Sequence, residues 1–213
     1  SLDFLSAMKW TRCAARRGSS TPRAVRCPAP CVAATRRLTT HPRAYFYSLD
    51  DRGNLFCEAD SAAEARPLAT ATRPLSHAPS LNLIFRNLRP KHDDDDEQRR
   101  LYPFVSPCGR ERNHLRCADT PVVFRDLELR DGCWELIYAG SLSQLFEPSK
   151  LRACPRSGRL YHELGGRLAG CDGLLRSALV QTFASVLAEG ADGRFRLEWE
   201  GREYTVPWLA DRL

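Results

Sequence analysis

Apolar and polar residues alternate in several short runs along this chain, and such alternation is typical of half-buried β-strands. Residues 45–49 and 54–58 flank a turn at 50–53, where Gly53 can adopt the positive φ angle that a tight hairpin needs. We therefore predict that the folded part begins with a β-hairpin.

A second hairpin is predicted in the middle of the chain, where residues 101–138 are rich in β-forming residues. Residues 122–130 and 133–139 flank Asp131-Gly132, a dipeptide that favours the hairpin turn. Three further strands are predicted by alternation, at residues 159–164, 194–200 and 202–206.

The first strand of the second hairpin is irregular. The alternation of apolar and polar residues changes face between Phe124 and Leu127. Because an extra residue in one strand produces such a shift, we predict a bulge or a twist at this point.

Two helices are predicted from apolar residues spaced three and four positions apart. The first covers residues 80–88 and ends before Pro90. The second has Asp172 as N-cap, covers residues 173–189 and ends at Gly190. Its apolar stripe consists of Leu174, Leu175, Ala178, Leu179, Phe183, Val186 and Leu187.

No strand–helix–strand alternation and no internal repeat is present. The pattern therefore favours an α+β fold, in which an antiparallel sheet carries the long C-terminal amphipathic helix on one face. We expect a single domain at residues 45–213. Within it, the Ala-, Pro- and Ser-rich stretch 59–80 and the acidic run 93–97 are predicted loops.

Positive charge is concentrated near the N-terminus. Nine basic residues and no acidic one lie between Met8 and Ala44, whereas residues 45–213 hold 23 basic and 25 acidic residues, a net charge of −2. Because nucleic-acid binding usually needs positive charge on the folded domain, we expect no nucleic-acid partner. The twelve-residue charge-free stretch 177–188 is shorter than the roughly 20 residues of a membrane span, and we expect none.

Residues 8–40 are rich in Arg, Ala, Ser and Thr and contain neither acidic residues nor an apolar core. This composition is typical of a mitochondrial transit peptide. We predict that residues 1–44 are a transit peptide or basic tail, with cleavage within 36–43, and that the protein works in the mitochondrial matrix. A plastid address has a similar composition and remains an alternative.

Six of the nine cysteines lie in the expected domain. They are Cys57, Cys108, Cys117, Cys133, Cys154 and Cys171. They form no Cys-x-x-Cys pair, and no histidine completes a zinc-site spacing. We therefore predict free thiols that pack as small hydrophobic residues, and no metal site.

The densest group of reactive side chains lies in residues 104–124. Its candidate ligand-binding residues are Cys108, Arg110, Glu111, Arg112, Asn113, Arg116, Cys117 and Asp119. The arginines could hold a phosphate or carboxylate, since guanidinium groups bind both in bidentate fashion. Cys108, His114 and Asp119 could instead act as nucleophile, base and orienting acid. The third interpretation is structural: a turn at 107–109 and then a strand, with Arg110 and Arg112 paired to Glu111, Asp119 or other acidic residues.

Residues 165–173 are glycine-rich and lie between a predicted strand and the predicted helix start, a place where a phosphate could bind. Their spacing matches neither the dinucleotide-binding motif nor the P-loop, and Asp172 as N-cap would occupy the same N–H groups. We interpret this stretch as a loop with a helix cap.

Residues 102–124 contain SPCGRERNHLRC, a motif long enough to be specific. Through this motif, the chain resembles a eukaryotic group known as uncharacterised protein family 0598, whose members are mostly assigned to mitochondria. The other matching stretches are residues 45–56, 81–89, 158–161 and 173–179. The resemblance implies one domain and a mitochondrial location, and it brings no activity, cofactor or catalytic residue. The chain departs from the family pattern at 59–80 and in the acidic run.

These observations favour a non-enzymatic accessory or interaction module whose partner is a mitochondrial protein complex. The alternative is an anionic small-ligand-binding protein or enzyme that uses residues 108–119. The sequence does not decide whether the protein is an enzyme, and it identifies neither catalytic residues nor a cofactor.

Overall fold

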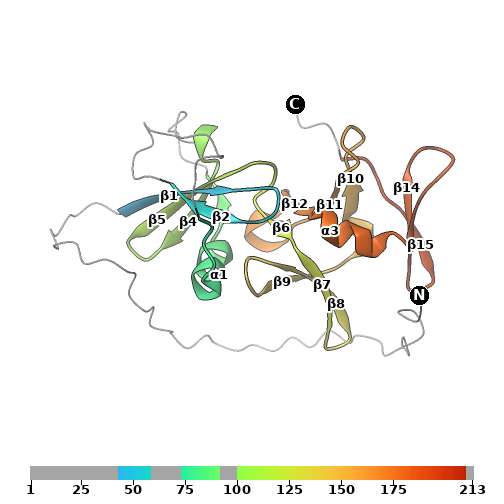
Figure 1. Ribbon diagram of the computed structural model, residues 1–213, viewed down its shortest axis with the longest axis horizontal. Coiled ribbons are helices and arrows are strands. Elements are labelled where there is room, and N and C mark those ends of the chain that lie inside the picture. The colour runs from blue at the N-terminus through green and yellow to red at the C-terminus, as the bar shows by residue number, and fades with distance from the viewer. Residues whose placement is uncertain (1–42, 59–72, 92–99, 210–213) are drawn as a thin grey trace.

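The computed structural model describes residues 43–58, 73–91 and 100–209, and their strands form four small sheets (Figure 1). The described part of the chain is mostly β. The predicted α+β fold, with one antiparallel sheet and a long C-terminal helix on one face, is therefore wrong.

The first sheet has five strands in the order β2-β1-β5-β4-β3. They are β1 (Arg43–Leu49), β2 (Leu55–Cys57), β3 (Arg89–Pro90), β4 (Phe104–Cys108) and β5 (Glu111–Cys117). β1 and β5 are parallel, and the other neighbours are antiparallel. Helix α1 (Ala78–Arg86) packs against β4 and buries Leu81, Ile84 and Phe85, which confirms the amphipathic helix predicted at 80–88.

The second sheet has the order β10-β11-β12-β6, and its β12 and β6 are parallel. Its strands are β6 (Val123–Phe124), β10 (Leu151–Ala153), β11 (Leu160–Glu163) and β12 (Asp172–Leu175). The third sheet consists of β7 (Asp126–Arg130), β8 (Cys133–Tyr138) and β9 (Leu142–Leu145). The fourth consists of β13 (Leu187–Glu189), β14 (Phe195–Trp199) and β15 (Arg202–Thr205). Both three-stranded sheets are antiparallel.

A shared hydrophobic core joins the four sheets. Its members include Leu115 of β5, Phe124 of β6, Leu136 of β8, Leu174 of β12 and Leu197 of β14, each at most 3% exposed. Burial of one such side chain contributes about 1.5–3 kcal/mol. The sheets are individually small, and this common core stabilises them together.

Both predicted hairpins are present. Gly53, between β1 and β2, has φ +80°. Asp131 and Gly132, between β7 and β8, have φ +49° and +80°, the two positive angles that a type I′ turn requires. The predicted strands at 159–164, 194–200 and 202–206 correspond to β11, β14 and β15.

The predicted irregularity in the second hairpin is a β-bulge. The Arg125 N–H donates to the Ile137 carbonyl at 2.8 Å, and Asp126 also lies opposite Ile137 in the register. Two residues of one strand therefore face one residue of the other. At this bulge the chain passes from β6 in the second sheet to β7 in the third.

The long helix predicted at 173–189 is absent. The chain there forms β12, the four-residue helix α3 (Ser177–Val180), the 3-10 turn η5 (Gln181–Phe183) and then β13. Leu174 and Leu175 are both buried, so consecutive side chains face protein on both sides, as in a strand covered on both faces. Leu179 and Phe183 are buried four positions apart, which explains the helical period of the sequence.

The predicted loop at 59–80 lies mostly outside the described residues, and the acidic run 93–97 and the tail up to residue 42 lie wholly outside them. Within the described ranges, no helix is long and apolar enough to cross a membrane.

Candidate functional site

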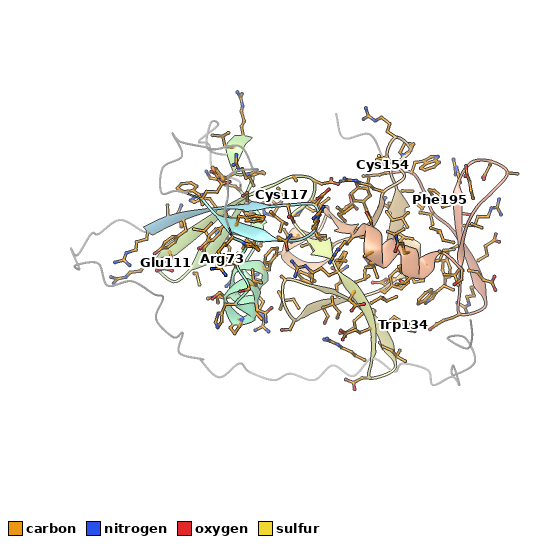
Figure 2. All side chains as sticks on the ribbon, in the orientation of Figure 1. Arg73, Glu111, Cys117, Trp134, Cys154 and Phe195 are labelled. Carbon is orange, nitrogen blue, oxygen red and sulfur yellow. The ribbon has the colours of Figure 1, made fainter. Side chains whose placement is uncertain are left out.

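Strand β5 carries most of the candidate residues, and its alternation separates them onto two faces of the first sheet. One face carries Arg112, His114 and Arg116. The other carries Glu111, Asn113 and Cys117. A strand of seven residues spans about 20 Å, so Arg110 before β5 and Asp119 after it are far apart. Figure 2 shows the two ends of the strand at the labelled Glu111 and Cys117.

Arg116 is bound inside the fold by Glu58, the residue that follows β2. The Arg116 Nε and Nη2 donate to Glu58 Oε1 at 2.8 and 2.5 Å, and the two side chains are only 15% and 11% exposed. The Tyr102 hydroxyl donates to the other carboxylate oxygen at 2.5 Å. Burial and this hydrogen bond raise the pKa of Tyr102 to about 12, so the tyrosine stays a donor at neutral pH.

His114 lies on the same face, packed among aromatic rings. Its ring stacks on Phe46 with centroids 5.2 Å apart, and Phe46 contacts Tyr102 at 4.9 Å. His114 is 4% exposed. Ser48 is fully buried, and its register partner on β5 is Arg116. This face is therefore a packed polar and aromatic layer.

The opposite face of β5 is equally enclosed. The Asn113 side chain is buried and donates to the Ser106 carbonyl at 3.1 Å. Burial raises the pKa of the Cys117 thiol to about 12, with smaller contributions from Cys171 and Asp119. Since the thiolate is the reactive form, Cys117 is an inert packing residue at neutral pH.

Asp119 belongs to a network at the far end of β5. It accepts hydrogen bonds from the Tyr161 hydroxyl at 2.9 Å and from Arg159 at 3.1 Å. Arg159 also donates to Asp51 at 3.1 Å, in the turn of the first hairpin. Burial and the bond to Asp119 raise the pKa of Tyr161 to about 12. The network joins the first and second sheets.

Three arginines lie at the near end of the first sheet, with Arg43 on the face of Glu111 and Arg112 on the opposite face. Gly109 has φ +61° in the two-residue turn between β4 and β5, which places Arg110 at the tip. The Arg43 N–H donates to the Arg110 carbonyl at 3.1 Å, and Arg112 lies on β5 opposite the residue after Arg43. All three arginine side chains belong to exposed residues. We call Arg43, Arg110 and Arg112 the arginine end.

The structure does not bring Cys108, His114 and Asp119 together. Cys108 lies opposite Glu111 and shares its face, whereas His114 lies on the other face of β5. Asp119 is bound to Tyr161 and Arg159 instead. Within the described residues, no group of three or more His, Cys, Asp or Glu side chains is placed to hold a metal.

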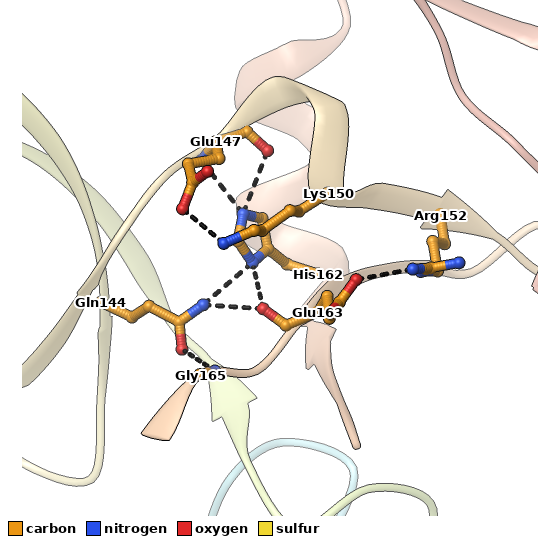
Figure 3. A network of polar contacts seen from close by, with 7 residues as sticks. All are labelled: Gln144, Glu147, Lys150, Arg152, His162, Glu163 and Gly165. Atoms are coloured by element: carbon orange, nitrogen blue, oxygen red, sulfur yellow. Dashed lines mark hydrogen bonds and ion pairs between the residues drawn. The ribbon is translucent and has the colours of Figure 1, made fainter. Parts of the chain in front are cut away.

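A further polar network surrounds His162 of β11, which is fully buried (Figure 3). Nδ1 lies 2.8 Å from the Glu163 carbonyl, and Nε2 accepts from the Glu147 N–H at 3.1 Å. Gln144 donates to the Glu163 carbonyl at 2.8 Å and accepts from the Gly165 N–H at 3.3 Å. Gln144 Nε2 also lies 3.1 Å from Nδ1, and the Glu147 carbonyl lies 3.2 Å from Nε2, so each ring nitrogen has both a donor and an acceptor within reach. Burial lowers the pKa of the ring.

The sequence carried no signal for this network. His162 is expected on a strand, but its partners Gln144 and Glu147 lie 18 and 15 residues earlier. Such partners come together only when the second and third sheets pack against each other.

The glycine-rich stretch 165–173 contains no helix start. Residues 166–168 form the 3-10 turn η4 (Gly166–Leu168), and Asp172 lies in β12 instead of capping a helix. The Asp172 carboxylate lies 3.7 Å from Arg152 Nε. A phosphate site at a helix N-terminus is therefore not formed here.

Comparison with known proteins gives a family and two structures. The family described as a domain of unknown function (DUF4505) matches residues 36–208. The structure is similar to a DUF1285 family protein from Silicibacter pomeroyi DSS-3, at 15% identity and a TM-score of 0.47, over 78% of this chain and 83% of that one. It is also similar to a DUF1285 family protein from Shewanella baltica OS155, at 15% identity and a TM-score of 0.41, over 65% of this chain and 90% of that one.

Proposed function

Because the chain belongs to this family of unknown function (DUF4505), we propose its function from its own residues: it is a non-enzymatic accessory module that binds a protein complex in the mitochondrial matrix. The arginine end is the contact surface. The family match confirms the expectation that the domain belongs to a family without an assigned activity. The mitochondrial location and the assignment to family 0598 are part of this proposal.

The proposal rests on one observation: some candidate residues are bound inside the fold, whereas others lie exposed at the arginine end. Arg116 is bound to Glu58, and Asp119 is bound to Tyr161 and Arg159, so these groups stabilise the fold. The arginine end is exposed. Exposed guanidinium groups form bidentate contacts with carboxylates, which suits an acidic surface of a partner protein.

The location is supported by composition. The segment from Met8 to Ala44 has nine basic residues and no acidic one, as mitochondrial transit peptides have. Cleavage within residues 36–43 on the N-terminal side of Arg43 would keep all three residues of the arginine end, and any cleavage in this range keeps Arg110 and Arg112.

The second candidate function is binding of a small anion. Arg110 and Arg112 of the arginine end support it, because they lie two residues apart at the start of β5, and two guanidinium groups can share one phosphate or carboxylate. In this case the chain would act alone, with the anion as its ligand.

The test is the native size of the full chain in gently solubilised mitochondria. We expect the wild type to migrate with a larger complex, and Arg110→Ala/Arg112→Ala to migrate as the free domain. The matched control is Arg194→Ala/Arg202→Ala, which removes two exposed arginines from the fourth sheet and should leave the complex intact.

Migration of the wild type as a lone domain overturns the accessory function. The anion function then predicts that inorganic phosphate or citrate raises the melting temperature of the wild type and of the control variant. Arg110→Ala/Arg112→Ala should lose that increase while its melting temperature without ligand stays the same.

A further inference from the structure

We propose that two copies of this chain associate through the free edge of the third sheet, by antiparallel pairing of β7 with β7 of the second copy, centred on Leu129. This edge and the arginine end lie on different sheets. The inference therefore goes beyond the proposed function and does not depend on it.

Among the described residues, strand β7 has a neighbouring strand on one side only. The third sheet has the order β7-β8-β9, and Figure 1 shows the β7–β8 hairpin reaching the lower border of the molecule. At the opposite edge, the Gln144 side chain of β9 bonds to the Glu163 carbonyl and the Gly165 N–H, so the second sheet lies next to β9. The β7 edge carries the exposed Leu129 and the charged residues on either side of it.

The hairpin turn determines which backbone groups face this edge. A two-residue turn makes Arg130 and Glu128 hydrogen-bonded partners of β8, so Leu127 and Leu129 point their backbone groups away from β8. The Leu127 N–H donates to its neighbour Asp126 Oδ1 at 2.8 Å, as expected for a group outside the ladder. The N–H and C=O of Leu129 face the open edge.

The side chain at this position is also exposed. Leu129 is 57% exposed, the highest value among the exposed large hydrophobic residues described. It lies opposite Trp134 on β8, and the Trp134 ring contacts Trp199 at 5.5 Å. Leu129 thus extends an apolar surface to the edge of the sheet, where a second Leu129 would cover it.

The charges next to Leu129 are self-complementary. When Leu129 pairs with the partner's Leu129 in antiparallel fashion, Glu128 lies opposite the partner's Arg130, and Arg130 lies opposite the partner's Glu128. Within one chain Arg130 and Glu128 pair with each other at 2.6 Å, and both are partly exposed, at 40% and 44%. In the dimer each of them would also face its opposite charge on the second copy. Opposite charges directly across two strands stabilise their pairing, and the two-fold axis supplies two such pairs.

Other antiparallel registers are less favourable. Centring the pairing on Glu128 would place this carboxylate against the partner's Glu128. Centring it on Leu127 would place Asp126 against the partner's Glu128, and would need the Leu127 N–H that already bonds to Asp126. Like charges directly opposite each other are destabilising, so the register centred on Leu129 is preferred.

Sedimentation velocity of the full chain tests this interface. The concentrations should extend to about 200 µM, because a single strand edge buries little area and gives weak association. We expect a monomer–dimer equilibrium for the wild type. Glu128→Arg and Arg130→Glu each place like charges in both facing pairs, and each should weaken dimerisation about tenfold or more.

The two single variants complement each other. Glu128→Arg leaves two positive charges on the edge of its chain, and Arg130→Glu leaves two negative charges, so an equimolar mixture should recover dimer formation. The double variant Glu128→Arg/Arg130→Glu should also self-associate, because its reversed charges still oppose each other. Leu145→Lys, at an exposed leucine of β9, should leave the equilibrium unchanged. Circular dichroism and thermal melting establish that each variant is folded.

Three results would overturn the inference. The first is a wild type that stays monomeric throughout the concentration range. The second is a dimer that both single variants retain, which would place the interface elsewhere. The third is folded single variants that neither the mixture nor the double variant rescues.

Discussion

Arg116 and Glu58 form an ion pair that joins the centre of the first sheet to the end of its first hairpin, across 58 residues of sequence. The guanidinium Nε lies 2.8 Å from Oε1, and the arginine also lies over the Tyr102 ring at 5.9 Å. Removal of one partner of an enclosed pair leaves the other desolvated and unpaired. The pair is therefore a structural constraint of the fold.

Glu58→Gln should lower the free energy of unfolding by about 1–3 kcal/mol, because a neutral amide would replace the carboxylate that faces Arg116. Urea denaturation measures this loss. The matched control is Glu203→Gln, which breaks the exposed pair with Arg196 and should change stability by less than about 1 kcal/mol. Equal effects of the two substitutions would contradict a structural role of the enclosed pair.

Gly173→Ala should destabilise the protein by about 1–3 kcal/mol. A Cβ atom at this position would lie 2.5 Å from Phe124 Cε2 and 3.0 Å from Leu164 Cδ2, so the core must shift. In a helix the same substitution would instead stabilise by about 0.5–1 kcal/mol, so the sign of the change distinguishes strand from helix. Gly165→Ala, with no atom within 4 Å of the added carbon, is the control and should be nearly neutral.

His162 should make stability depend on pH below neutrality. Burial lowers its pKa below the ordinary 6.5, so the folded state binds fewer protons than the unfolded state as the pH falls. The contribution of the neutral ring is complete above the unfolded pKa and is lost progressively as the pH falls from about 7 towards the lower folded pKa.

Urea unfolding at pH 5, 6 and 7 measures this slope for the wild type and for His162→Gln. The variant should be less stable at pH 7 and should show a shallower decrease towards pH 5. His77→Gln, at an exposed histidine, should keep the slope of the wild type. A wild-type slope that persists in His162→Gln would assign the effect to another group.

Cys154 should be alkylated before Cys117 at neutral pH. Hydrogen bonds from the Ser157 hydroxyl and from the Ser157 and Arg156 N–H groups lower the pKa of the Cys154 thiol, whereas burial raises that of Cys117 to about 12. Timed iodoacetamide labelling with peptide mass spectrometry follows both sites. Ser157→Ala should slow labelling of Cys154, and Cys117 should react only when the protein unfolds. Labelling of Cys117 at the rate of Cys154 in the folded protein would contradict this assignment.

The candidate segment shows what sequence reasoning can reach. Reactive side chains are dense in residues 104–124, and the structural interpretation of a turn followed by a strand matches β5. That interpretation paired Arg110 and Arg112 with Glu111, Asp119 or other acidic residues, whereas the pair found in the structure is Arg116 with Glu58, and Asp119 bonds to Arg159. The acidic partner itself was not predictable, because Glu58 lies 58 residues away and meets Arg116 only through the pairing of β1 with β5. The division of the segment into two faces follows from its strand conformation.

By itself, the sequence determined the local elements: the hairpin turns at Gly53 and Asp131-Gly132, the amphipathic helix α1 and the bulge at Arg125. These signals act within a few residues, through φ preference and side-chain period. Tertiary structure decided the rest. Residues 172–189 carry an apolar period that suits a helix, but β11 and β6 flank β12 and Phe124 occupies the space beside Gly173, so this segment begins as a strand. As a strand, β12 pairs with a neighbour on each side and buries the consecutive Leu174 and Leu175 on opposite faces, and these contacts outweigh the local helical preference.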